Sequence, residues 1–182
     1  MAWGGDGFAI LWDGKKIHGL NASGRAPEAW KPEYFTGKSA MDLIGWNTVT
    51  VPGMVAGWVD LSRKFGKLPF TQLFKRAIDY AENGFPVSPV IARQWREAIP
   101  ILKDQPGFKE SFLIDGKSPQ AGQIWKFPAQ AKTLKEIAAT ETASFYRGPL
   151  AQGMVDFAQA TGGCFTMQDF ANYNTEWVEP LA

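Results

Sequence analysis

Apolar and polar residues alternate with two different periods along the chain, and each period predicts its own kind of element. Near the start, short apolar runs cover Phe8 to Trp12 and Lys15 to Leu20, with Asp13-Gly14 between them. Asp-Gly suits the positive backbone angles of a tight two-residue turn, so the runs predict a β-hairpin. A lone hairpin is marginally stable, and we therefore expect further strands or a helix layer to cover its faces. One more strand is expected, from Trp46 to Val51.

Beyond the hairpin, apolar residues recur every three or four positions, which is the period of one face of an α-helix. Start and stop signals bound these stretches, because Pro52 fits a first helical turn, Gly66 and Gly84 follow the last periodic residues, and Ser88 is suited to an N-cap. Five helices are thus predicted: from Pro52 to Gly66, from Phe70 to Gly84, from Ser88 to Leu102, from Pro128 to Ala139 and from Leu150 to Ala158. The third of them is expected to kink at Pro100.

The remaining segments are predicted as loops and one short helix. Lys103 to Gln123 has no sustained apolar period and is predicted as a loop with a short turn. Thr166 and Asp169 have the spacing of a capping box, which predicts a short final helix. The pattern therefore predicts an α+β chain that is mostly helical, with an N-terminal β-hairpin.

Size and composition favour a compact globular chain. With 182 residues, 45% of them hydrophobic, it can bury roughly 70% of the surface that its unfolded form exposes, so we expect one domain over residues 1–182. Its net charge is +1, and basic and acidic residues are interspersed, so neither nucleic acid nor an anionic membrane is an expected partner. No apolar run approaches the roughly 18 residues of a membrane span. The single cysteine, Cys164, excludes an internal disulfide and favours a reducing compartment such as the cytoplasm, without deciding the localisation.

Two long stretches carry a family resemblance. The first is WNTVTVPGMVAGWVDLSRKFGKLPFTQLFKRAIDYAENGFPVS, from Trp46 to Ser88, in which a Val-Pro-Gly turn opens one helix and a Phe-Gly-Lys-Leu-Pro link starts the next. The second runs from Phe127 to Leu181 and contains a Phe-Tyr-Arg-Gly step, a Gly-Gly pair and the capped turn before a Tyr. Both resemble the large-subunit core of the gamma-glutamyltransferase family, whose members are also called gamma-glutamyltranspeptidases.

The resemblance implies a fold and a reaction. Members of the family fold as four-layer αββα N-terminal-nucleophile hydrolases and cleave themselves to free the amine of a Thr, which then attacks the substrate amide. A hydroxyl is a weak nucleophile at neutral pH, and an adjacent free α-amine can act as its base. That Thr begins the small subunit of the family, and no threonine here has its Thr-Thr context. We therefore expect an internal piece of the large subunit, truncated at both ends, with no catalytic residue and no activity of its own.

One departure from the family pattern concerns the acyl group. Transferases of the family carry Leu-Asp-x-Arg-Glu-x-Ala-Pro after the hairpin, and its Arg holds the α-carboxylate of the glutamyl group. The matching stretch here runs from Leu20 to Pro27 and reads LNASGRAP, which puts Ser23 at the position of that Arg and Arg25 two residues later. Because a planar guanidinium binds carboxylate in a forked geometry that Ser cannot reproduce, either Arg25 reaches the site or the acyl group is not glutamyl. This pattern is closer to the acylase-like branch of the family.

Arg25, Ser23 and Asn21 are accordingly the candidate substrate-binding residues. Each also has a simpler interpretation, because loop arginines often stay solvated and Ser and Asn often serve turn chemistry. His18 has no Cys, His or Asp at ligand spacing, so it is interpreted as a packing residue, and neither a metal nor a cofactor is expected. The run Gly4-Gly5-Asp6-Gly7 precedes a strand and lacks a following Gly-Lys-Ser/Thr, which excludes a phosphate loop.

Three hypotheses about function remain open at this point. In the first, the chain is a noncatalytic part of an amidohydrolase that transfers or hydrolyses a gamma-glutamyl or related acyl group, and its partners are that acyl-amide substrate and the remaining segments or small subunit of the same enzyme. In the second, it is a free-standing helical interaction module without enzymatic activity. In the third, it belongs to a split enzyme assembled from separate chains. A homo-oligomer is also expected, because a hairpin without flanking strands leaves unpaired edges and apolar faces.

Overall fold

The computed structural model describes residues 3–181, which pack into two compact units. The first unit comprises the described residues up to Phe70 together with those from Glu136 onward, and the second is Thr71–Lys135. Helix α6, Pro128–Thr140, contributes residues to both. A single domain over the whole chain stays a prediction.

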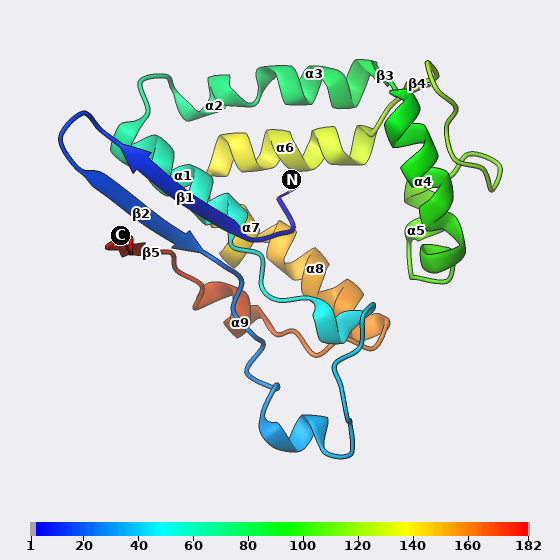
Figure 1. Cartoon of the computed structure of the whole chain (residues 1–182), viewed down its shortest axis with the longest axis horizontal. Helices are drawn as coiled ribbons and strands as arrows, with labels where there is room; N and C mark the ends of the chain where they lie inside the picture. The colour runs from blue at the N-terminus through cyan, green and yellow to red at the C-terminus, as the bar shows by residue number, and fades with distance from the viewer. Residues whose placement is uncertain (1–2, 182) are drawn as a thin grey trace. The chain divides into compact units, whose positions relative to one another are not determined.

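A three-stranded antiparallel sheet lies in the first unit. The strands are β1 (Gly7–Trp12), β2 (Ile17–Ala22) and β5 (Glu176–Val178), in the order β1-β2-β5. Figure 1 shows β5, near the C-terminal end of the chain, beside β2 of the blue hairpin. The predicted hairpin is confirmed, and the additional strand that it was expected to need comes from the far end of the chain.

The turn of this hairpin differs from the prediction. Trp12 pairs with Ile17, so the connection has four residues, and the second strand begins two residues later than expected. The Asp13 carboxylate explains the wider loop, because its Oδ1 accepts hydrogen bonds from the backbone N–H groups of Lys15 at 2.7 Å and Lys16 at 2.9 Å. Gly14 supplies a positive φ of 94°. The two-residue turn was therefore a wrong prediction.

Helix α1, Met54–Phe65, covers one face of the sheet. Leu20 and Ala22 of β2 are buried on that face, and the pleat places Asn21, which lies between them, on the opposite face of the sheet. The helix ends before Gly66, as predicted, but it begins at Met54 with Gly53 as its N-cap, so Pro52 precedes the helix instead of lying in its first turn. Gly57 lets the two elements approach closely, because a Cβ there would stand 2.9 Å from the Ala22 methyl.

The core of the first unit is completed by the helices near the C-terminus. These are α7 (Ala143–Arg147), α8 (Pro149–Ala160) and the five-residue α9 (Met167–Ala171). The capping box that starts α9 is confirmed, since Thr166 Oγ1 accepts from Asp169 N and the Asp169 carboxylate accepts from Thr166 N. The core consists of fully buried side chains, which come from α1, from the segment before it, and from α6, α7 and α9: Val51, Val55, Val59, Ile137, Phe145, Tyr146 and Phe170.

The segment between β2 and α1 contains no regular strand. Two short 3-10 helices, η1 (Pro32–Phe35) and η2 (Trp46–Thr48), interrupt it. The strand predicted from Trp46 to Val51 is therefore wrong except at its end, where Val51 forms an isolated bridge with Arg25. Trp46 of η2 serves tertiary packing instead, because its ring lies edge-on to Phe165 with centroids 5.9 Å apart.

In the second unit, the helix predicted from Phe70 is divided by a turn at Phe74 into α2 (Phe70–Leu73) and α3 (Lys75–Asn83). Helix α4, Pro89–Leu102, begins with Ser88 as N-cap, as predicted, and contains Pro100, where the kink stays a prediction. The stretch predicted as a loop holds a short helix, α5 (Phe108–Phe112). Strands β3 (Phe85–Pro86) and β4 (Ile124–Trp125) pair beside a core of aromatic and small residues: Phe85, Val87, Ala92, Trp95, Trp125 and Phe127.

Candidate functional site

Ser23 and Arg25 lie in the loop that follows β2, and Asn21, the third predicted substrate-binding residue, lies near the end of β2 itself. Hydrogen bonds from distant segments fix the backbone of this loop. Asn21 Oδ1 accepts from Ser23 N at 2.9 Å, which is an Asx turn. The Tyr173 hydroxyl donates to the Ser23 carbonyl at 2.9 Å, and Gly24 N donates to Asp6 Oδ1 at 2.6 Å. The loop is therefore held in one conformation from two sides.

Arg25 is tied through both its backbone and its side chain. Its carbonyl oxygen accepts from Val51 N at 2.9 Å, while a guanidinium N–H donates to the carboxylate of Glu176 in an ion pair. The Arg25 and Glu176 side chains are 49% and 54% exposed, respectively, so solvent and ligands can reach both. Arg25 thus presents a guanidinium that already has a carboxylate partner.

The strand register places Asn21 beside the same carboxylate. Asn21 of β2 pairs directly with Glu176 of β5, so their side chains share the face of the sheet that α1 does not cover. Phe8 of β1 pairs with Asn21 from the other side and is 71% exposed on this open face. An amide, a carboxylate, a guanidinium and an aromatic ring therefore come together here.

Two stacked tyrosines support the loop from beneath. The rings of Tyr173 and Tyr146 are nearly parallel, with centroids 5.2 Å apart. The Tyr146 hydroxyl donates to the Pro52 carbonyl at 2.7 Å and accepts from Ala56 N at 3.2 Å. Burial raises the pKa of Tyr173 to about 12 and raises the pKa of Tyr146 as well. Both phenols therefore stay protonated at neutral pH and act as hydrogen-bond donors that position the loop and the start of α1.

A pocket of about 270 Å³ opens next to Arg25. Its lining comes from the loop and from α9 and the residues after it: Arg25, Ala26, Glu28, Asp169, Asn172 and Tyr173. Glu28 N donates to Asp169 Oδ1 at 2.8 Å, which ties the loop to the capping box of α9. The pocket is polar and open, and Arg25 is its basic residue.

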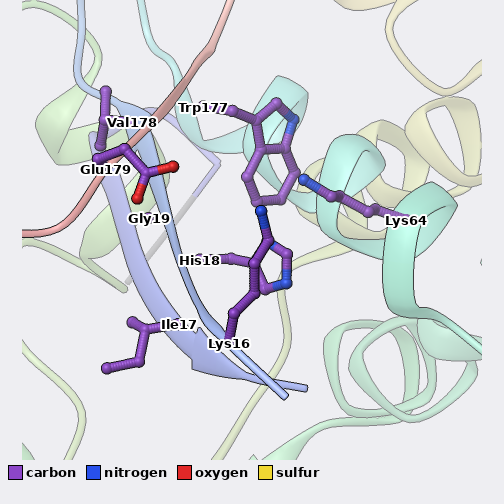
Figure 2. Close-up of a pocket in the computed structure, with 8 residues that line it drawn as sticks. All are labelled: Lys16, Ile17, His18, Gly19, Lys64, Trp177, Val178 and Glu179. Atoms are coloured by element: carbon purple, nitrogen blue, oxygen red, sulfur yellow. The ribbon is translucent and has the colours of Figure 1, made fainter. Parts of the chain in front are cut away.

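A second pocket is lined by residues in and next to β2 and β5 and by Lys64 of α1 (Figure 2). The ammonium of Lys64 sits 3.6 Å from the centroid of a Trp177 ring, a cation–π contact. His18 packs edge-on to Phe65, with ring centroids 5.0 Å apart, and its Nε2 lies 2.7 Å from Asp13 Oδ2. The hydrogen bond with His18, helped by those from Lys16 and Lys15, lowers the pKa of Asp13. The contact with Phe65 agrees with the packing interpretation of His18, whereas its Asp13 partner was not predicted.

Across residues 3–181, three or more His, Cys, Asp or Glu side chains nowhere gather as a metal would need. The same residues include no helix whose length and apolar content would let it cross a bilayer.

Comparison with known proteins identifies the family. The sequence profile described as gamma-glutamyltranspeptidase matches residues 1–182. The chain belongs to the gamma-glutamyltranspeptidase family.

Relatives within the family carry several names. The chain is 34% identical over 98% of its length to the glutathione hydrolase-like YwrD proenzyme of Bacillus subtilis, and 36% identical over 98% to the oxamate amidohydrolase proenzyme of Klebsiella pneumoniae. It covers 35% of each of these relatives. The chain thus spans about a third of the length of these curated relatives.

Solved structures agree with this assignment. The cephalosporin acylase of Bacillus halodurans superimposes with a TM-score of 0.92 at 39% identity, covering 98% of this chain and 35% of that one. The gamma-glutamyltranspeptidase of Pseudomonas nitroreducens, complexed with L-DON, gives a TM-score of 0.89 at 30% identity, covering 98% of this chain and 53% of that one. The predicted α+β fold, a part of the N-terminal-nucleophile hydrolase fold of this family, is confirmed.

Sequence reasoning found part of the loop and missed its partners. Arg25 and Asn21 both lie beside Glu176, whereas Ser23 contributes its carbonyl to Tyr173. Neither Glu176 nor Tyr173 was predicted, because each lies about 150 residues from the loop in sequence. The weak signal available was the short β-prone run of Thr175, Trp177 and Val178.

Proposed function

We propose that this chain is a noncatalytic large-subunit portion of an enzyme that transfers or hydrolyses a gamma-glutamyl or related acyl group through a Thr ester. One observation carries the proposal: the family profile matches the whole chain, while the chain spans about a third of proenzymes named glutathione hydrolase-like and oxamate amidohydrolase. The other segments of the same enzyme are then its partners, and an acyl amide is its substrate.

The chemistry of the nucleophile supports the division of labour. A Thr hydroxyl needs a base, and in this family the free α-amine of a chain-leading Thr serves. No Thr in the 182 residues has the Thr-Thr context in which the family frees that amine. The nucleophile would therefore come from a segment that this sequence does not include.

The proposed substrate contacts lie at the end of β2 and in the loop after it. Arg25 would bind a negatively charged or carbonyl oxygen of the acyl group, because its exposed guanidinium offers several donors in a fixed plane. Asn21 uses its carbonyl oxygen in the Asx turn, which leaves its NH₂ group free to donate to substrate. The Ser23 hydroxyl, at the position of the family's arginine, would serve as a small polar contact.

The test uses chromogenic anilides of gamma-glutamate and of glutarate. The whole protein that contains this chain should hydrolyse at least one of these or of other acyl anilides, and the purified 182-residue chain should hydrolyse none. Arg25→Gln in the whole protein should lower kcat/KM for the accepted anilide about tenfold, because a hydrogen bond to a charged group is lost.

Two results would contradict the proposal. Turnover by the pure 182-residue chain would show that it carries its own nucleophile. A whole protein that is inert toward these and other acyl anilides would favour the alternative, an interaction module without enzymatic activity.

A further inference from the structure

The Arg25 guanidinium, which was the group expected to bind a substrate carboxylate, is already paired with the carboxylate of Glu176. A guanidinium presents its N–H donors in one plane, and a carboxylate partner takes up part of that plane. Glu176 also brings a negative charge beside Arg25, so the pair is neutral as a unit. A second carboxylate that approaches Arg25 must displace Glu176 or share the guanidinium with it.

Glu176 is held in this place by its neighbours on both sides. Thr175 Oγ1 donates a hydrogen bond to the carboxylate of Asp60 on α1. The Trp177 ring packs edge-on to Phe65, with centroids 5.8 Å apart, and lies under the Lys64 ammonium (Figure 2). Alternation along β5 then directs Glu176 to the opposite face, toward Asn21 and the loop. Because β5 is fixed on α1, the backbone of Glu176 stays within side-chain reach of Arg25.

The rest of this face is apolar. Phe8, Ile10 and Trp12 of β1 are 71%, 77% and 61% exposed, and Phe8 lies directly across from Asn21. An acyl group that reaches Arg25 and Asn21 thus meets a neutral ion pair, an amide and an aromatic ring. This environment suits an uncharged acyl group better than a second anion.

We propose that Glu176 is a specificity-determining residue that keeps Arg25 neutralised and so selects acyl groups without a carboxylate at the end of the chain. The inference rests on the proposed function, and it names the substrate class of that same site: amides of neutral, largely apolar acyl groups. Removal of the Glu176 charge should free Arg25 for a carboxylate.

The experiment compares two acyl anilides of equal size with the whole protein. One is the glutaryl anilide, and the other is its carbamoyl analogue, in which a carboxamide replaces the terminal carboxylate. The readout is the ratio of kcat/KM for the carboxylate to kcat/KM for the carboxamide. Glu176→Gln should raise this ratio about threefold or more, the range expected when one exposed ion pair is exchanged for another. Glu176→Ala provides a second neutral variant if the first fails to fold.

Matched controls separate charge from structure. Glu179→Gln makes the same change in charge further along the same segment, where Glu179 lines the other pocket with His18 and Lys64, and it should leave the ratio unchanged. Glu176→Asp keeps the charge and should hold the ratio near the original value. In an Arg25→Gln background, Glu176→Gln should raise the ratio less, because the guanidinium that it frees is missing.

The outcomes distinguish this inference from the function on which it rests. If the unmodified protein hydrolyses neither these two anilides nor the gamma-glutamyl anilide, the proposed function is wrong. If it does turn over acyl anilides but the ratio in Glu176→Gln and Glu176→Ala stays the same or falls, Glu176 does not set the specificity. A selective loss of gamma-glutamyl turnover in these variants would likewise overturn the inference, since it would mean that Glu176 binds the substrate ammonium.

Discussion

At the scale of single residues, the site depends on a close approach that leaves no room for one methyl group. A Cβ at Gly53 would stand 2.1 Å from the Ala22 carbonyl oxygen and 2.1 Å from the Tyr173 hydroxyl oxygen. The Gly53 backbone has an ordinary helical φ of −92°, so space rather than backbone angle requires glycine here. This contact brings β2, the start of α1 and the tyrosine that holds the loop together at one point.

We predict that Gly53→Ala lowers the free energy of unfolding by about 2 kcal/mol, because the added methyl forces these backbone and hydroxyl groups apart. Urea unfolding of the purified chain measures the change. Gly153→Ala is the matched control, since Gly153 lies within α8 and its Cβ would meet no atom within 4 Å. The same change there should stabilise the chain by about 0.5–1 kcal/mol. Equal effects at the two positions would refute the steric argument.

At the scale of elements, the hairpin turn shows where local chemistry competes with a sequence rule. Asp13-Gly14 favours a two-residue turn, but the Asp13 carboxylate binds the backbone N–H groups of Lys15 and Lys16 and the His18 ring, and this widens the loop. The carboxylate thus determines where β2 begins. Its hydrogen bond with His18 is the main reason that the pKa of Asp13 lies well below the usual 3.8.

This shift predicts a pH dependence. A depressed carboxyl pKa in the folded state contributes stability that is present above the unfolded value and is lost as pH falls through the folded value. Asp13→Asn should therefore lower the melting temperature at pH 7 and make it fall less steeply below about pH 4. Thermal unfolding between pH 2 and pH 7 measures both effects. Asp115→Asn, in an exposed loop, is the control. Parallel curves for the Asp13→Asn and original chains would contradict the prediction.

How far the sequence predicts these elements depends on how local their causes are. Contacts within a few residues determine four features, all of which were predicted: the hairpin, helix α1 after Pro52, the Ser88 N-cap and the Thr166 capping box. Strand β5 was missed because three residues carry too little periodicity to identify a strand, and its partner lies at the other end of the chain. The break at Phe74 and the 3-10 helix at Trp46 likewise depend on tertiary surroundings that no local pattern encodes.

The candidate site was less predictable than the fold for the same reason. The position of Arg25 followed from the family pattern around Leu20 to Pro27, which is a local comparison. Its ion-pair partner Glu176 and the supporting Tyr173 come from segments about 150 residues away. The register of β2 with β5 brings them together, and that register was beyond the reach of the residue pattern.

At the scale of the whole molecule, the sheet presents an apolar face that no described element covers. Phe8, Ile10 and Trp12 point away from α1, and they are all more than half exposed within residues 3–181. Strand β1 also stands at an edge of the sheet, where its backbone groups can pair with another strand. A contiguous apolar face at a sheet edge favours association in water.

We predict that the purified 182-residue chain forms dimers or larger species through this face. Ile10→Lys should shift it to a monomer, because a charge in the middle of the face makes its burial against a second copy costly. Light scattering after size-exclusion chromatography, over a range of protein concentrations, gives the mass. Leu43→Lys serves as the control, because Leu43 is 95% exposed in the loop before α1 and should not affect assembly. A chain that stays monomeric at every concentration would show that the apolar face alone does not drive association. The two substitutions add the same charge at different places. If both abolished association equally, the loss of association would reflect net charge, or the interface would lie elsewhere.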